Sequence, residues 1–204
     1  MKSLLSRLGK NLAYIAMSLL PVMAIAVSGG PAHAEEINRG GQVSVAIPEA
    51  FTGFGPYDKR GRVDYLAIVN IFDTLVTYGP DYVPKGMLAE SWENPDENTW
   101  VFHLRQGVKF HDGTNFDANA VKFALEKIRE SNFKSQIEPI TEINVKDDYT
   151  VELKVKSAFI TLPAVLSQPF SSIVSPTAFN KLGAEEFAKH PVGTGPFKFV
   201  SWDP

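Results

Sequence analysis

The chain has 204 residues, of which 44% are hydrophobic, 21% are charged and none is cysteine. The lack of cysteine excludes disulfides, thiolate metal sites and a cysteine nucleophile. The formal net charge is −3, and an acidic balance argues against a nucleic-acid partner or an anionic membrane surface.

The first 34 residues have the pattern of a secretory signal peptide. They begin with three basic side chains and no acidic one, continue with an apolar run over residues 12–27, and end in Ala32-His33-Ala34. Pro21 interrupts the run, which is shorter than the about 20 residues of a membrane-spanning helix. We therefore expect cleavage after Ala34 and a soluble mature chain, whose 17 basic and 23 acidic residues give it a formal charge of −6.

After this leader, the first predicted element is a strand. Residues 41–47 alternate at period two, and Pro48 cannot extend the ladder. The following segment, 49–59, combines two glycines and a proline with three aromatic side chains, which is typical of a loop. Residues 64–76 carry apolar side chains at roughly helical spacing, so we expect a helix that is buried on one side.

The first predicted hairpin lies near the middle of the chain. Its strands cover residues 88–93 and 99–105, which flank the turn-forming run Asn94-Pro95-Asp96-Glu97-Asn98. The side chains that share one face of the second strand are large and apolar, namely Trp100, Phe102 and Leu104. We expect this face to be buried, because such side chains favour a pleated surface that is covered on one side.

A helix and a second hairpin follow. Asp117 is a good N-cap for a helix over residues 118–130, in which apolar residues recur at the i, i+3, i+4, i+7 spacing of one buried face. Residues 140–146 and 150–156 alternate around Asp147-Asp148, which predicts an antiparallel hairpin with one exposed face.

Towards the C-terminus, proline and glycine mark the predicted boundaries. Pro163 and Pro176 each lie at a helix start, where the missing N–H costs nothing. Gly183 interrupts the second of these helices, and residues 197–202 alternate as a final strand.

The sequence has no catalytic or metal-binding pattern. His103, His111 and His190 show neither the helical spacing nor the clustering of metal ligands, so we expect separate surface histidines. No Gly-x-Ser-x-Gly sequence occurs, and adjacent acidic pairs such as Glu185-Glu186 are expected to be solvated surface charges. We predict no catalytic residue, no metal and no cofactor, and hence that the protein is not an enzyme.

Two segments resemble the motifs of a known family. The stretch Leu88–Gly113, LAESWENPDENTWVFHLRQGVKFHDG, is followed downstream by Pro191–Phe197, PVGTGPF. In this order and at this distance they resemble the motifs of the extracellular solute-binding proteins of ABC importers, family 5, which take up peptides, nickel and related solutes. A phosphate-binding loop is a poorer explanation of Gly193-Thr194-Gly195, because neither a lysine with serine or threonine nor a helix follows.

The resemblance implies an α/β fold of the periplasmic-binding-protein type (type II, family 5) with mixed sheets. This chain would be its N-terminal portion, without the C-terminal lobe. Residues 35–47 would begin domain I, residues 48–189 would form domain II, and residues 190–204 would return into domain I. Gly193-Thr194-Gly195 would then lie at the crossover between the two domains.

The resemblance also implies a function. The protein would be the periplasmic substrate-binding component of an ABC importer, a monomer that captures a small solute between two lobes and delivers it to the permease subunits in the inner membrane. A di- or oligopeptide is the first expectation, with nickel complexes, opines, oligosaccharides and haem as alternatives. The segment after the first strand faces the cleft in this family, which assigns ligand contacts to Glu49, Ala50, Phe51, Thr52, Phe54 and Tyr57.

Some features depart from the family pattern. The lack of cysteine removes the lipid-anchored cysteine of many relatives, which favours a free periplasmic protein. Phe54-Gly55-Pro56 stands where the family commonly has a leucine, an aspartate or asparagine, and a proline, so the acidic or amide side chain is missing. The alternative function is a non-binding remnant or an interaction module on the same scaffold, and a secreted hydrolase is a weaker alternative.

Overall fold

The computed structural model describes residues 40–47, 49–58 and 61–203, so the predicted leader and its cleavage site lie outside the described residues. The chain divides into two units, Met1–Ser44 and Val45–Pro204. The described part of the first unit is exposed and has neither helix nor strand. Of the helices that the structure describes, none combines the length and apolar character needed to cross a membrane.

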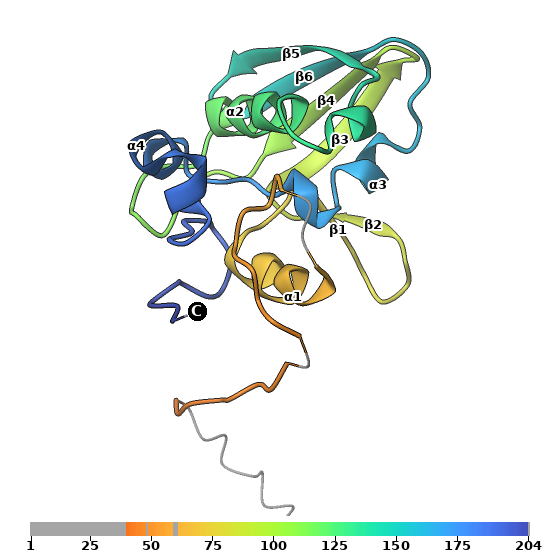
Figure 1. The fold of residues 1–204 in the computed structure, drawn as a ribbon. Helices are drawn as coiled ribbons and strands as arrows, with labels where there is room; N and C mark the ends of the chain where they lie inside the picture. The colour runs from red at the N-terminus through yellow and green to blue at the C-terminus, as the bar shows by residue number, and fades with distance from the viewer. Residues whose placement is uncertain (1–39, 48, 59–60, 204) are drawn as a thin grey trace, which may run out of the picture. The chain divides into compact units, whose positions relative to one another are not determined.

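A four-stranded antiparallel sheet is the main element of the second unit (Figure 1). Its strands, in spatial order, are β3 (Ala89–Asp96), β4 (Thr99–Leu104), β6 (Thr150–Val155) and β5 (Ile140–Asp147). Both predicted hairpins are confirmed, and the structure adds that β4 pairs with β6, with Phe102 opposite Val151 and Trp100 opposite Leu153. This register places the apolar side chains of the two hairpins on the same face, where all four are buried.

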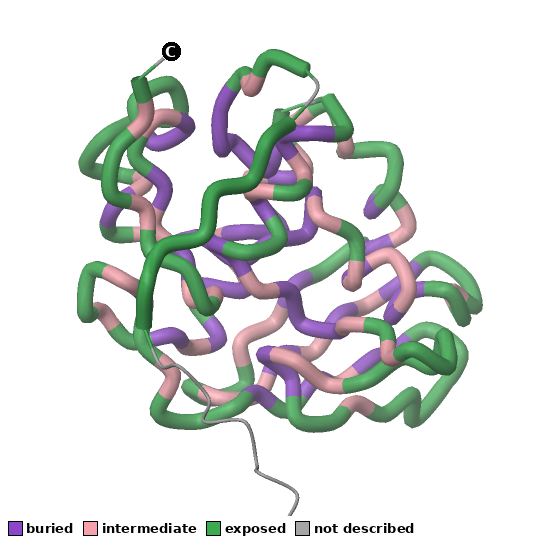
Figure 2. Tube along the Cα trace, turned by 90° about the horizontal axis from the view of Figure 1, so that it is seen from below, coloured by how far each residue is buried: buried purple, intermediate pink, exposed green. Residues whose placement is uncertain are grey.

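Helix α2 (Ala118–Arg129) covers that apolar face (Figure 1). The Asp117 carboxylate accepts from the amides of Asn119 (2.9 Å) and Ala120 (3.0 Å), so the predicted N-cap is confirmed. The predicted apolar stripe of the helix, Val121, Ala124, Leu125 and Ile128, is buried. Figure 2 shows the buried positions in the interior of the second unit.

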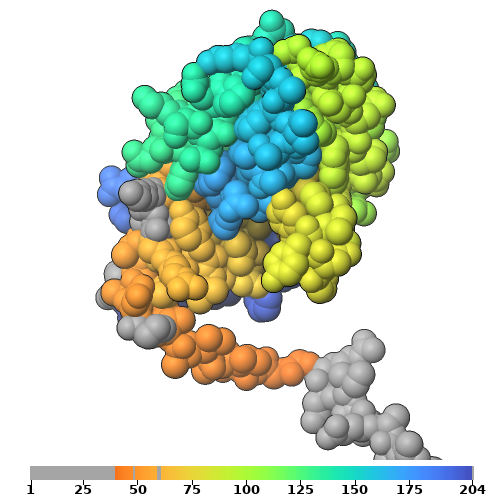
Figure 3. Space-filling model, turned by 90° about the vertical axis from the view of Figure 1, so that its right-hand side faces the viewer, coloured from red at the N-terminus to blue at the C-terminus, as the bar shows by residue number. Residues whose placement is uncertain are grey.

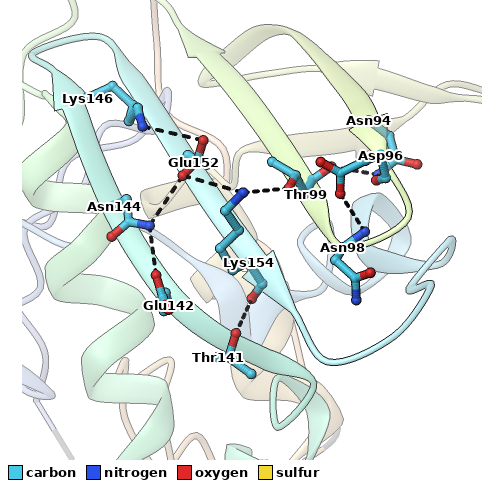
Figure 4. A network of polar contacts seen from close by, with 10 residues as sticks. All are labelled: Asn94, Asp96, Asn98, Thr99, Thr141, Glu142, Asn144, Lys146, Glu152 and Lys154. Carbon is cyan, nitrogen blue, oxygen red and sulfur yellow. Dashed lines mark hydrogen bonds and ion pairs between the residues drawn. The ribbon is translucent and has the colours of Figure 1, made fainter.

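The opposite face of the sheet carries polar side chains that are bonded to one another (Figure 4). Glu152, whose side chain is mostly buried, accepts from Asn144 (3.3 Å) and lies 3.4 Å from the Lys146 ammonium and 3.9 Å from the Lys154 ammonium. Lys154 also donates to the Thr99 hydroxyl at 2.7 Å. Lys146 and Lys154 thus neutralise the Glu152 carboxylate, so this face carries ion pairs and hydrogen bonds rather than a free acid.

The remaining elements connect and flank this sheet. They are α1 (Arg62–Ile71), the hairpin of β1 (Val76–Tyr78) and β2 (Pro84–Gly86), the 3-10 turns Lys134–Gln136 and Pro169–Ser171, α3 (Leu162–Val165) and α4 (Pro176–Phe187). Gly183 interrupts α4 with φ of 75°, as predicted. Every strand pair among the described residues is antiparallel, so the expected mixture of parallel and antiparallel strands is not seen in this part of the fold.

Two predicted strands are not formed, which corrects the expectation. Residues 41–47 are exposed along their length (Figure 2), with Val43 87% and Val45 78% exposed. Residues 197–202 also lack strand structure, and Val200 is 89% exposed. Alternation alone does not make a strand, because the ladder needs a neighbouring strand, and the described residues provide none beside either segment.

The boundaries predicted for the helix over residues 64–76 are wrong at both ends. It begins at Arg62 and ends at Ile71, and Val76 already belongs to β1. The backbone carbonyls of Asp73, Thr74 and Leu75 accept from amides of other segments instead of continuing the helix. Of the apolar side chains in this helix, Leu66 and Val69 are exposed, while Ile68 and Ile71 are buried.

Candidate functional site

The ligand loop, residues 49–57, is fixed to the first turn of α1. Thr52 donates twice to the Asp64 carboxylate, from its amide to Oδ1 and from its hydroxyl to Oδ2, both at 2.7 Å. Asp64 is 1% exposed and also accepts from the Gly61 amide at 3.1 Å. The buried carboxylate therefore holds the loop and the helix start together, a role that an acidic residue in a first helical turn could have signalled in the sequence.

Tyr57 closes the ligand loop against the core. Its ring is buried, and its hydroxyl donates to the Ser172 carbonyl at 2.9 Å. Burial raises the pKa of Tyr57 above its ordinary value, and a backbone hydrogen bond lowers it by less. Tyr57, one of the six predicted ligand residues, is thus a neutral side chain whose hydroxyl is already hydrogen-bonded within the protein.

The other predicted ligand residues differ in exposure. Glu49, Ala50 and Thr52 are exposed, Phe51 is half-buried and Phe54 is buried. The Phe51 and Phe54 rings are 4.5 Å apart, and both pack on Trp202, at 5.3 Å and 6.1 Å between ring centres. Phe199 adds an edge-on contact with Phe54 at 5.3 Å. We call Phe51, Phe54, Phe199 and Trp202 the aromatic cluster.

The aromatic cluster joins two segments that are distant in the sequence. The ligand loop contributes two rings, and the segment after the second motif contributes the other two. Phe199 and Trp202 were expected to belong to a strand and to have no role at the site. Their alternation with polar residues indicates only that one side is covered, not what covers it.

A cavity of about 430 Å³ lies beside the cluster. It is lined by Thr52, Asp58, Ala184, Glu185, Ala188, Lys189 and Trp202. Lys189 donates to Glu186 at 2.8 Å and lies 3.5 Å from Glu185; this hydrogen bond lowers the pKa of Glu186 and raises the pKa of Lys189. The cavity therefore offers a hydroxyl, charges of both signs and an aromatic ring to a small polar molecule, while of the predicted ligand residues Thr52 alone lines it.

The crossover loop, residues 191–198, packs on the end of α1. Gly195 donates to the Ile71 carbonyl at 2.9 Å, and Phe197 donates to the Asn70 carbonyl at 3.0 Å. The Thr194 hydroxyl donates to the Asp73 carboxylate at 2.8 Å. The predicted crossover residues thus lie together against one helix end.

The crossover loop needs glycine at two positions, because its backbone lies very close to the backbone of α1 there. A Cβ on Gly195 would lie 2.6 Å from the Asn70 carbonyl oxygen and 2.7 Å from the Ile71 carbonyl carbon. A Cβ on Gly193 would collide with the Ile71 carbonyl oxygen. Neither glycine has a positive φ, so the reason for glycine is the small space between two backbones rather than a backbone conformation that only glycine adopts.

His111 is not the surface histidine that we expected. It is half-buried, its Nε2 lies 2.8 Å from the Gly195 carbonyl, and its amide donates to the Gly193 carbonyl at 2.9 Å. His103 and His190 are exposed, as expected. Among the described residues, no group of three or more histidine, aspartate or glutamate side chains is placed to hold a metal ion.

A serine and an aspartate lie close together near His111, but their contacts are structural. The Ser175 hydroxyl donates to Asp112 at 2.6 Å and accepts from the Ala178 amide at 3.1 Å, which caps α4. Ser175 is fully buried and has no histidine as a hydrogen-bond partner among the described residues. The arrangement lacks the nucleophile–base contact that a hydrolase needs.

Residues 83–204 match the family model of the bacterial extracellular solute-binding proteins, family 5 Middle. The glutathione-binding proteins GsiB of Salmonella paratyphi A and Shigella flexneri are 34% and 32% identical to this chain over 168 and 166 residues. Each alignment covers 79% of this chain and 32% of the relative, so the chain spans about a third of the length of these relatives.

Solved structures of solute-binding proteins are also similar to this chain. The binding protein AgaA of A. tumefacien R10 with agropinic acid has a TM-score of 0.70 and 33% identity, over 76% of this chain and 32% of that chain. DppA of Helicobacter pylori with the peptide STSA has a TM-score of 0.66 and 31% identity, over 75% of this chain and 35% of that chain.

These relatives are solute-binding proteins and not enzymes, which agrees with the expectation from the sequence. Their α/β, periplasmic-binding-protein-like fold is also the fold of this chain. The two motifs, the matched residues 83–204 and the shared fold together establish that the chain belongs to the bacterial extracellular solute-binding proteins, family 5.

Proposed function

We propose that the protein is the periplasmic substrate-binding component of an ABC importer, which captures a small solute and delivers it to the permease subunits of the inner membrane. The observation that carries the proposal is the meeting of the ligand loop and the segment after the crossover loop in one aromatic cluster, beside a cavity of about 430 Å³. This arrangement suits one wall of a ligand cleft, because it combines apolar rings with a few polar groups.

The domain boundaries implied by the family are part of this proposal. Residues 35–47 begin domain I, residues 48–189 form domain II, and residues 190–204 return into domain I. The close packing of the crossover loop on α1 supports a junction at this place. The leader before residue 35 supports export to the periplasm, and the acidic mature chain supports a small-molecule partner rather than a nucleic acid. We propose that the protein works as a monomer.

A di- or oligopeptide is the ligand class that we propose first. GsiB is named for glutathione, which is a modified tripeptide, and DppA was solved with a peptide. Backbone recognition would tolerate varied side chains, which suits a loop with few charged groups such as residues 49–57. Opines and nickel complexes are the competing classes, because relatives of similar identity are associated with agropinic acid and with nickel.

The ligand is tested by thermal unfolding of the product of the complete reading frame that contains this chain. Glutathione, a tetrapeptide, an opine and a nickel–histidine complex are added separately, and a ligand at 100 times its Kd should stabilise the folded state by about 2.7 kcal/mol. We expect stabilisation by the peptides, and stabilisation by none of the four would overturn the proposal. Thr52→Val should reduce the effect, whereas Glu90→Gln, an exposed position on β3, is the matched control.

The 204-residue chain itself is the second arm of the experiment. One wall of a cleft buries only part of a ligand, so we expect no micromolar affinity for these peptides by calorimetry.

Permease and ATPase genes next to the coding sequence are the expected genomic context. A neighbourhood without them would speak against the transport role even if a ligand were found.

A further inference from the structure

The first motif ends in a turn that is rigid in its own right. In the His111 turn, residues 110–114, the Phe110 amide donates to the Thr114 carbonyl and the Gly113 amide to the Phe110 carbonyl, both at 2.9 Å. Asp112 accepts from Thr114 within the turn and from Ser175 on α4. Partial burial raises the pKa of Asp112, but the hydrogen bonds from Ser175 and Thr114 outweigh it, so the pKa lies below its ordinary value. The carboxylate is thus held ionised, and it fixes the turn to α4.

From this turn, His111 contacts the crossover loop at three places. Its amide donates to the Gly193 carbonyl, its ring Nε2 lies 2.8 Å from the Gly195 carbonyl, and its own carbonyl accepts from the Lys198 ammonium at 3.0 Å. Two of these contacts use the backbone of His111 and would persist with any side chain. The contact of the ring with Gly195 depends on the side chain, because it needs a donor that reaches the Gly195 carbonyl.

The ring contact has a defined direction. A carbonyl oxygen only accepts, so Nε2 must carry the hydrogen, and the neutral ring is the Nε2–H tautomer. The same peptide segment is held from its other side, because the Gly195 amide donates to the Ile71 carbonyl of α1. Gly195 is therefore bonded to the end of α1 by its amide and to the His111 turn by its carbonyl.

Beyond Gly195, the chain leads directly to the aromatic cluster. Phe197 is still bonded to α1, and then Phe199 and Trp202 pack on Phe54 and Phe51 of the ligand loop. His111 has no ring contact with these aromatic side chains among the contacts described, so any effect on them must pass through the crossover loop. The path from Gly195 to Trp202 is short and has neither helix nor strand; Phe197 and Lys198 hold its first part, through Asn70 and the His111 carbonyl.

We propose that His111 is a positioning residue: its Nε2–H···O=C bond to Gly195 sets the path of the crossover loop and thereby places Trp202 and the aromatic cluster beside the ligand loop. The role of this cluster at a ligand site rests on the proposed function, but the positioning itself does not. It can be tested without a ligand, so its failure is distinguishable from failure of the transport role.

The test uses the chain labelled with 5-fluorotryptophan. The chain has three tryptophans, of which Trp92 and Trp100 lie in the sheet and serve as internal references. Three proteins are compared with the wild type by ¹⁹F NMR: His111→Phe keeps a ring without a donor, His111→Gln keeps a donor without the ring, and Trp202→Phe assigns the signal. We expect His111→Phe to shift or broaden the Trp202 signal alone, and His111→Gln to restore it.

Amide hydrogen exchange and histidine NMR complete the test. Loss of one hydrogen bond should speed exchange of the Gly195 and Phe197 amides about tenfold in His111→Phe, with most of the effect reversed in His111→Gln. In the ¹⁵N-histidine-labelled wild type, the His111 ring should be the Nε2–H tautomer. An unchanged Trp202 signal, equal shifts of all three tryptophans, failure of glutamine to rescue, or an Nδ1–H tautomer would each overturn the proposal. The last readout needs no variant, so it decides even if His111→Phe does not fold.

Discussion

The Tyr57 hydroxyl is buried, and it donates to the Ser172 carbonyl at 2.9 Å. Burial raises its pKa above the value in the unfolded chain, which is about 10. The folded state therefore holds its proton where the unfolded state releases it, so this contribution to stability is complete below about pH 10 and is lost as the pH rises further. At neutral pH the residue is a plain hydrogen-bond donor.

The first prediction follows for Tyr57→Phe. The substitution should cost about 1–2 kcal/mol at pH 7, because the Ser172 carbonyl loses its donor, and it should flatten the fall in stability above about pH 10. Urea unfolding at pH 7 and at several alkaline values measures both effects. Tyr78→Phe, at an exposed position, is the control. An alkaline slope that is the same in Tyr57→Phe and the wild type would contradict the assignment.

Tyr82 is strained in the backbone rather than in its contacts. It has φ of 57°, a region that favours glycine, and its side chain is 86% exposed. It is the next-to-last residue of the loop, residues 79–83, that joins β1 to β2, where the Tyr82 amide donates to the Gly79 carbonyl at 3.0 Å. The hairpin lies at the surface, beside the segment that contains α3 (Figure 3).

The second prediction concerns this position. Tyr82→Gly should stabilise the protein by about 0.5–1 kcal/mol, because glycine adopts the left-handed conformation without the steric cost of a Cβ. Tyr82→Ala removes the side chain and keeps the strain, so it should leave the free energy of unfolding almost unchanged. Equal gains for alanine and glycine would show that the side chain, and not the backbone, is the source of the cost.

At the scale of elements, the crossover loop and α1 are joined by two backbone hydrogen bonds, from the Gly195 amide to Ile71 and from the Phe197 amide to Asn70. The third prediction compares Gly195→Ala with Gly183→Ala. At Gly195 the added Cβ meets backbone atoms of Asn70 and Ile71, which cannot move cheaply, so we expect a loss of about 2–3 kcal/mol. At Gly183 nothing lies near the added Cβ and only the positive φ of 75° opposes alanine, which should cost about 1 kcal/mol.

Chemical denaturation of both variants measures the difference. The crossover variant should also alter the near-ultraviolet circular dichroism of the aromatic cluster, which the Gly183 variant should leave unchanged. Similar losses of stability in the two variants would mean that the loop can move away from α1 at little cost.

Elements whose signals are local were predictable from the sequence. The two hairpins and α2 follow from alternation, a turn-forming run and an N-cap, each of which lies within the element itself, and all three are confirmed. The prediction of strands over residues 41–47 and 197–202 failed, because a strand also depends on a neighbouring strand, which the local pattern does not reveal. The same reason explains α1, whose last predicted turn gives its backbone hydrogen bonds to other segments.

The candidate site was predictable only in part. The crossover glycines were singled out by their motif, but the sequence did not show that they pack on Asn70 and Ile71. Asp64, His111 and Trp202 gained their roles through contacts with residues that are 12 to 151 positions away in the chain, as with Thr52, Gly195 and Phe51. Contacts at such separations leave no periodic trace in a single sequence.

At the scale of the whole molecule, one hydrophobic cluster extends through the second unit from Phe54 and Tyr57, across the sheet and α2, to Phe187. A single cluster predicts one cooperative unfolding transition for this unit. The ligand loop belongs to the cluster through its rings, whereas residues 41–47 are exposed and contribute no buried side chain to it.

The last prediction separates these two N-terminal segments by shortening the mature chain. A chain that begins at Glu49 should unfold within about 0.5 kcal/mol of the chain that begins at Glu35, because the removed part that the structure describes is exposed. A chain that begins at Gly55 also loses Phe51, Phe54 and the two Thr52 hydrogen bonds to Asp64, so it should lose at least about 3 kcal/mol. Urea midpoints and m-values for the three chains decide between these expectations. A large loss on starting at Glu49 would show that residues 41–47 are packed in solution, and a small loss on starting at Gly55 would show that the ligand loop is not part of the core.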